Sequence, residues 1–98
     1  MKHPAIALMD KIMDVTDKIT ARAEGLRPHV SHLKVEGEVV TATVKSATKD
    51  TLVYEVSIHL TERRRRCSCE AHVRYRDTPC KHTVATAMVV RDILSLME

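Results

Sequence analysis

The sequence predicts an α+β domain in which an N-terminal helix, a short antiparallel β-meander, a Cys/His-rich turn and a C-terminal helix follow one another. Apolar residues recur at helical spacing near both ends of the chain, and an alternating, β-branched region separates them. Since 98 residues are enough for one domain and too few for two, a single domain is expected over residues 1–98. Its parts are the helix (1–28), the meander (29–60) and the Cys/His-rich segment with the last helix (61–98).

The N-terminal segment is predicted to form one helix from Pro4 to Ala23, because its apolar residues recur in alternating steps of three and four. This stripe consists of Ala5, Leu8, Ile12, Val15 and Ile19. Pro4 suits the first turn, and Gly25 followed by Pro28 suits the end. A second stripe, Ile6, Met9 and Met13, widens the apolar face. That face either packs into a groove of its own domain or binds a partner, for example a second copy in a homodimer through the apolar helices.

Residues 29–60 are predicted to form three antiparallel strands joined by tight turns. The first ends at Glu36-Gly37, the second is the alternating run Val39–Val44, and Lys49-Asp50 marks the next turn. The third strand, residues 52–60, alternates most clearly. Its apolar face carries Leu52, Tyr54, Val56, Ile58 and Leu60.

The chain is predicted to close with a helix over residues 82–97, again from apolar residues at helical spacing. These are Val84, Ala85, Met88, Val89, Ile93, Leu96 and Met97.

Two short motifs between the meander and the last helix are typical of a metal site. Cys67 and Cys69 stand two residues apart, a spacing that places both thiols on the same face of an extended strand. Cys80 and His82 have the same spacing. On a helix such residues lie about 200° apart, so Cys80 should precede the helix and His82 should occupy its first turn. Pro79 favours this entry because it fixes its own backbone and extends the residue before it.

The set Cys67, Cys69, Cys80 and His82 matches one structural zinc ion in closed tetrahedral coordination. No position is left for water or substrate, so metal catalysis is not expected. Metal binding and folding should be one event, linked by about 10 kcal/mol or more. His72, three residues after Cys69, is the one competitor for a ligand position. Two other readings of the cysteines are buried inert thiols and a redox pair.

Cysteine number and hydropathy favour a soluble protein of the cytoplasm. Three cysteines, two of them separated by one residue, do not suit a secreted disulfide scaffold, so a reducing compartment fits better. The apolar stretch Ala5–Met9 is interrupted by Asp10, well short of a signal sequence or a membrane span. No membrane contact is expected.

The pattern Cys67-x-Cys69, ten residues, Cys80-x-His82 resembles the SWIM zinc finger, whose CxC and CxH motifs precede a helix. The resemblance covers about residues 52–97, while residues 1–50 carry no motif that we can assign. In the SWIM subunit of Shu-type recombination complexes, an Ala follows the His by three residues, as Ala85 does here. The resemblance implies a ββα module around zinc that binds DNA or another protein. It also implies an adaptor role in homologous recombination or repair, docked on a RecA-family ATPase or recombinase paralogue.

Positive charge is concentrated in residues 61–98, which carry eight basic and five acidic side chains. Such residues could contact a phosphate backbone or an acidic protein surface. On a strand, however, alternate side chains point to opposite faces, and a solvated, solubilising edge strand is an equally good reading. With Tyr54 and Tyr75 as the only aromatics, base stacking is not expected, so DNA binding should be sequence-independent. The candidate contact residues are Arg63, Arg64, Arg65, Arg66, Arg74, Arg76 and Lys81.

An enzyme is not expected. Asp10, Asp14 and Asp17 lie near helical spacing within the predicted first helix, but they lie opposite its apolar stripe, where solvated side chains are usual. The expected function is a non-catalytic accessory protein of DNA recombination or repair that works at the nucleoid and has no small-molecule substrate. The alternative is a free-standing DNA-binding or regulatory zinc-finger protein.

Overall fold

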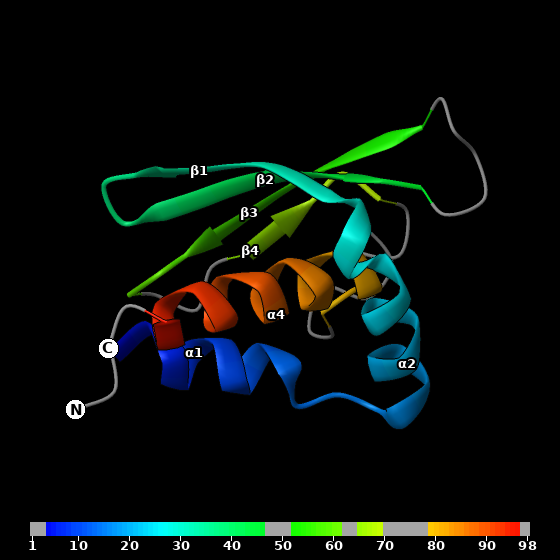
Figure 1. Ribbon diagram of the computed structural model, residues 1–98, viewed down its shortest axis with the longest axis horizontal. Helices are drawn as coiled ribbons and strands as arrows, with labels where there is room; N and C mark the ends of the chain where they lie inside the picture. Colours follow the sequence, from blue (N-terminus) through cyan, green and yellow to red (C-terminus); the bar gives the residue numbers. More distant parts are fainter. Residues whose placement is uncertain (1–3, 47–51, 62–64, 70–78, 97–98) are drawn as a thin grey trace.

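A computed structural model describes residues 4–46, 52–61, 65–69 and 79–96 of the chain. The helices and strands form two parts, a four-stranded antiparallel sheet and a set of helices that covers one of its faces (Figure 1). The predicted α+β class and the order of its elements are therefore confirmed. The elements are α1 (Pro4–Met13), α2 (Asp17–Leu26), a 3-10 turn η1 (Arg27–His29), β1 (Val30–Glu36), β2 (Val39–Lys45), β3 (Val53–His59), β4 (Arg65–Cys67) and α4 (Lys81–Leu96).

The N-terminal segment forms two helices, so the prediction of one helix from Pro4 to Ala23 is wrong. The apolar spacing continues across the break, but Thr16 starts a new helix. Its backbone is extended, and its side-chain oxygen accepts a hydrogen bond from the amide of Ile19 at 3.4 Å. Gly25 lies within α2 and does not end it, while Pro28 lies in the turn η1.

The break also separates the three aspartates that were predicted to share one helix. Asp10 lies on α1, Asp14 between the helices and Asp17 at the start of α2. All three are exposed, and Asp10 forms an ion pair with Arg91 of α4.

The strands pair in the order β1-β2-β3-β4. Gly37 has a φ of 61° at the first position of the two-residue turn between β1 and β2, a conformation that glycine adopts without a steric penalty. A bulge interrupts β1 between Ser31 and Lys34. At this bulge His32 has a φ of 52°, and its Nδ1 atom lies 3.1 Å from the hydroxyl of Thr43 on β2.

Helix α4 lies between the sheet and α1 (Figure 1). Every residue from His82 to Met88 is buried, as expected for a helix that is covered on more than one side. Ile6, Met9 and Ile12 of α1 are buried too, so the wide apolar face of this helix packs within its own fold. Ion pairs from Asp10 to Arg91 and from Arg27 to Asp92 join α1 and η1 to α4.

None of the helices in the described part of the chain has the length and apolar character needed to cross a lipid bilayer.

Candidate metal centre

Strand β4 and the two residues after it position the first two candidate ligands, Cys67 and Cys69. The strand pairs with β3 so that Cys67 stands opposite Val56, whose side chain is buried beneath the sheet. The next residue, Ser68, is held to Glu55 twice: its amide donates to the carbonyl of Glu55, and its hydroxyl accepts from the amide, both at 3.0 Å. These contacts extend the pairing past β4 and place Cys69 beyond the strand end, as the CxC spacing predicted.

The N-terminus of α4 delivers the other two candidate ligands. Cys80 directly precedes the helix, and its carbonyl accepts the amide of Val84 at 3.0 Å. His82 is the second helical residue. Both positions agree with the prediction, and the physical reason is the wide angle between residues i and i+2 on a helix. If both residues were helical, their side chains would diverge.

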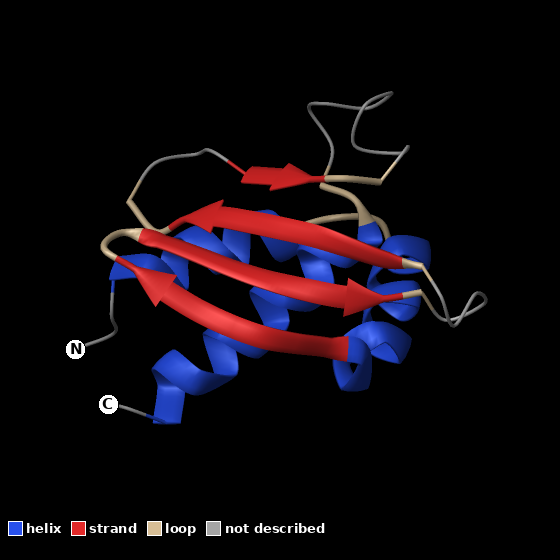
Figure 2. Cartoon of the chain, turned by 90° about the horizontal axis from the view of Figure 1, so that it is seen from above, coloured by secondary structure: helices blue, strands red, loops and turns tan. Residues whose placement is uncertain are grey.

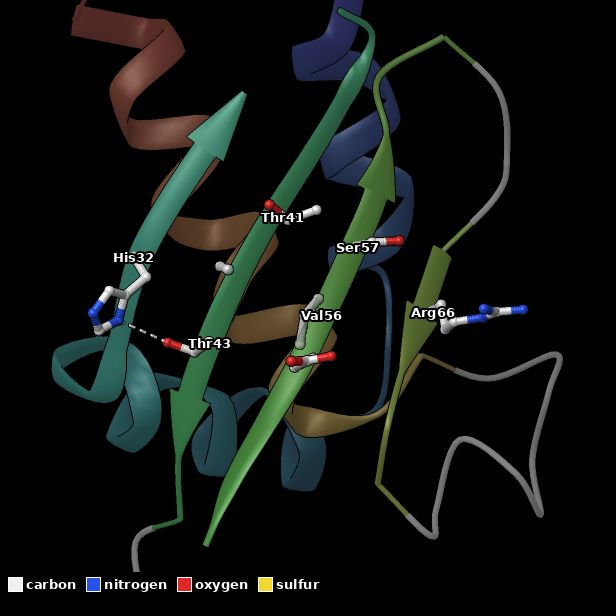
Figure 3. A pocket seen from close by; sticks show the side chains of 8 residues that line it. His32, Thr41, Thr43, Val56, Ser57 and Arg66 are labelled. Atoms are coloured by element: carbon white, nitrogen blue, oxygen red, sulfur yellow. Dashed lines mark hydrogen bonds between the residues drawn. The ribbon is translucent and has the colours of Figure 1, made fainter. Parts of the chain in front are cut away.

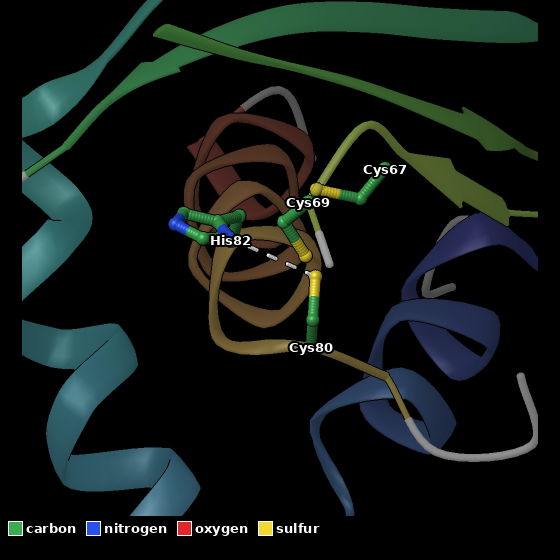
Figure 4. Close-up of side chains that lie close together, drawn as sticks. All are labelled: Cys67, Cys69, Cys80 and His82. Carbon is green, nitrogen blue, oxygen red and sulfur yellow. Dashed lines mark hydrogen bonds between the residues drawn. The ribbon is translucent and has the colours of Figure 1, made fainter. Parts of the chain in front are cut away.

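The four side chains meet at one point beside the first turn of α4 (Figure 4). Their ligand atoms all lie within 4.8 Å of one another. In a tetrahedral site with metal–sulfur distances of about 2.3 Å, the sulfur atoms are separated by about 3.8 Å, so a small contraction completes the coordination. Each of these residues is at most 6% exposed. The cluster can therefore hold one metal ion with protein donors alone.

Hydrogen bonding within the cluster prepares one thiol for metal. A hydrogen bond from Cys67 lowers the pKa of Cys80 to about 3, and further donors are His82 and both the hydroxyl and the amide of Thr83. The same Cys67–Cys80 bond raises the pKa of Cys67 above its ordinary value, and burial raises it further. Of this coupled pair, Cys80 is the thiol that loses its proton more readily, and a metal ion would displace the proton held on Cys67.

Two neighbours of the ligands were not predicted. The hydroxyl of Thr83 lies 3.3 Å from the sulfur of Cys80, and this hydrogen bond lowers the pKa of the thiol, as a hydroxyl that donates to the sulfur does. The ring of Tyr54, on β3, lies against the ring of His82 with 4.2 Å between their centroids. The sequence offers a signal for Thr83, which follows a ligand on the first helical turn. The partner of Tyr54 depends on how α4 lies across the sheet.

The structure also bears on the alternatives to this ligand set, which were buried inert thiols, a redox pair of cysteines, and His72 as a ligand. None of the three cysteines, all of which the structure describes, forms a disulfide bond. Among the described residues, this is the one group of three or more His, Cys, Asp or Glu side chains close enough to hold a metal ion. His72, the predicted competitor, lies outside the described residues.

Three of the predicted basic residues lie beside the cluster. Arg65 and Arg66 belong to β4, opposite Ile58 and Ser57 respectively, and so point to opposite faces of the sheet. Only Arg66 is on the open face, which the helices leave uncovered. Lys81 is exposed at the start of α4. The other candidates, Arg63, Arg64, Arg74 and Arg76, lie outside the described residues.

The open face of the sheet carries a polar groove that the sequence did not predict (Figure 3). Its volume is about 430 Å³, and it extends from His32 on β1 to Arg66 on β4. Hydroxyl groups of Thr41, Thr43 and Ser57 line it. The carboxylate of Glu55 also lines the groove, while the guanidinium of Arg66 lies at one end of it. The positive charge of the groove is therefore at the Arg66 end.

The geometry thus brings together one complete donor set, with three basic side chains next to it, of which Arg66 and Lys81 are exposed. Comparison with protein-family models, with curated proteins and with solved structures gave no match.

Proposed function

We propose that the chain is a non-catalytic, SWIM-type zinc module in which Cys67, Cys69, Cys80 and His82 bind one structural Zn²⁺. The observation that carries the proposal is the buried Cys₃His donor set. Two of its ligands come from the end of β4 and two from the start of α4, which are separated in the sequence. Three sulfurs and one imidazole are the ligands that zinc prefers in structural sites. Four protein donors leave no open position, which favours a structural role over catalysis.

The ion would connect β4 to α4 where few other contacts do so. Strand β4 is three residues long and, in the part of the chain that the structure describes, pairs with β3 alone at one edge of the sheet. Such a short edge strand is weak by itself. Zinc bound between β4 and the start of α4 would hold this edge in place, and with it Arg66 and Lys81. The thiols would remain available for the metal in a reducing, cytoplasmic compartment.

We further propose that this edge binds a polyanion, with DNA as the first candidate. Arg66 reaches the open face at one end of a groove lined with hydroxyl groups, and Arg, Ser and Thr side chains commonly contact phosphate oxygens. These contacts read no bases, so binding would be independent of sequence. The resemblance of the CxC…CxH pattern to SWIM proteins extends the proposal to recombination and repair, with the chain as an adaptor for a RecA-family ATPase. A free-standing DNA-binding protein is the alternative.

The experiment is a salt titration of DNA binding, followed by fluorescence anisotropy on a short labelled duplex. Replacing Arg66 or Lys81 with alanine should weaken binding, and each lost phosphate contact should reduce the slope of log affinity against log salt by about 0.9. Lys18→Ala is the matched control, because Lys18 is exposed on α2 in the helical part of the fold. Equal slopes in all four proteins would exclude DNA as the partner of this edge.

Affinity purification from the source cells separates the adaptor from the free-standing protein. Co-purification of a RecA-family ATPase, lost when the metal is chelated, is expected for the adaptor. Recovery of DNA without such a protein would favour the alternative.

A further inference from the structure

Strand β1 is an open edge of the sheet with an exposed apolar side chain near its C-terminal end. In the described part of the chain, β1 pairs with β2 on one side and with no strand on the other (Figure 2). Its residue Val35 is 60% exposed. Val35 stands opposite Val40, whose side chain is buried under the sheet, so it lies on the same side as the helices. Soluble proteins usually protect such an edge, because it can accept another strand.

Apolar surface continues from this edge onto α4. A groove of about 330 Å³ lies between the β1–β2 hairpin and the C-terminal half of α4, and Val35 and Ile93 line its two sides. Ile93 is 40% exposed and Leu96, on the last turn of α4, is 86% exposed. Figure 2 shows this end of α4 emerging beyond the β1 edge. Edge strand and helix end therefore present one apolar surface.

The backbone at Val35 is directed toward the open edge. Antiparallel ladders alternate between residues that bond the neighbouring strand and residues that point away. Glu36 and Val39 flank the two-residue turn and face each other as its closing pair. The amide and carbonyl of the preceding residue, Val35, therefore point outward, where an added strand would bond them.

The charges beside Val35 are self-complementary. Lys34 and Glu36 flank it on the open face and lie 2.7 Å apart as an ion pair. If a second β1 pairs antiparallel about a two-fold axis at Val35, the two valines are opposite one another. Lys34 then faces Glu36 of the partner subunit, and Glu36 faces the partner's Lys34. Opposite charges directly across two strands are favourable.

We propose that the chain forms a two-fold homodimer through β1, centred on Val35. The occupant of the edge is a second copy, because the order of charges on β1 complements itself when reversed, as an isologous interface requires. The two sheets become one of eight strands, and Val35, Ile93 and Leu96 of both copies gather on its helical side. Strand β4 lies at the opposite edge, so both Cys₃His clusters and both Arg66 side chains remain at the outer ends.

The first test is the mass of the protein in solution, measured by light scattering after size exclusion over a range of concentrations. The wild type should have twice the mass of one chain. Val35→Lys places two like charges at the centre of the interface and should give the mass of a single chain. Val53→Lys is the matched control, because Val53 is 48% exposed on the inner strand β3, and it should remain dimeric.

The second test uses the charge pattern and does not depend on whether one variant folds. Lys34→Glu alone sets Glu against Glu across the interface, and Glu36→Lys alone sets Lys against Lys, so each should be monomeric. An equimolar mixture of the two variants should dimerise, because one subunit then carries two acids and the other two bases. The double variant should dimerise by itself.

Two results would overturn the proposal. One is a wild type that stays monomeric at every concentration, which would show that β1 does not pair with a second copy of the chain. The other is a dimer that Val35→Lys does not dissociate, which would place the contact elsewhere.

Discussion

Replacing Thr83 with valine tests whether the surroundings of the sulfur atoms tune the metal site. The substitution keeps the shape of the side chain and removes its hydroxyl, which donates to the sulfur of Cys80 at 3.3 Å. Thr83 is fully buried, so no water can replace the lost donor. The helix and the four ligands should be unchanged.

The expected loss follows from the charge of the acceptor. A hydrogen bond to a charged group contributes about 1.5 to 3 kcal/mol. The lower value applies here, because sulfur is a weak acceptor and the amide of Thr83 still donates to it. About 1.5 kcal/mol corresponds to a roughly tenfold weaker affinity for the metal, within the range usual for groups that support a ligand.

The assay is competition for zinc with a chromogenic chelator at constant pH. Thr86→Val is the control: Thr86 is equally buried on the same helix, but its hydroxyl donates to the backbone carbonyl of His82 at 2.9 Å and to no sulfur. This variant should bind zinc within about threefold of the wild type, since a hydroxyl that donates to the backbone carbonyl four residues earlier has only a slight effect on a helix. Equal affinities for wild type and Thr83→Val would refute the reasoning.

Two further predictions concern protons and packing. Zinc affinity should fall as the pH falls, about tenfold per pH unit for each proton displaced, because Cys67 has a raised pKa and must lose its proton to bind; chelator competition at pH 8 and pH 6 measures this, and a constant affinity would contradict it. Met9→Ala should reduce the free energy of unfolding of the zinc-loaded protein by about 2 to 5 kcal/mol, because Met9 is fully buried in the core. Urea unfolding measures this loss, with exposed Lys11→Ala as the control; a loss below about 1 kcal/mol would show that α1 packs loosely.

The candidate metal site could be predicted because its ligands lie in two short sequence motifs. Each ligand pair is separated by two residues, and the chemistry of thiols and imidazole restricts what such a pair can do. Pro79 and the apolar spacing after it indicated where α4 begins. The sequence could not show that the two pairs meet, since this depends on how β4 lies against β3 and how α4 packs under the sheet.

The sequence pattern missed the break before α2 and the bulge in β1. At both places a local hydrogen bond overrides the regular spacing of apolar residues. Thr16 caps α2 although the apolar spacing passes through it without interruption, and a threonine followed by an acidic residue was the available signal. The bulge at His32 has no such signal, because a positive φ is uncommon for any residue other than glycine and here accompanies contacts with β2.

The open groove and the exposed β1 edge are properties of the assembled sheet. Alternation predicted which face of each strand would be buried, and the buried Val56 and Ile58 of β3 agree with it. The order of the strands decides which of them is an edge. Only the structure shows that Val35 is at an edge while Val53 lies on an inner strand.

The most direct test of the zinc site is the metal content of the purified protein, measured by native mass spectrometry with elemental analysis. Wild-type protein should carry one zinc ion per chain, and chelation should release β4 from the start of α4. Cys67→Ala should lose the ion, while Ser68→Ala, which leaves all four donors in place, should keep it. A wild type purified without zinc, or a Cys67→Ala variant that retains both its metal and its fold, would contradict the account.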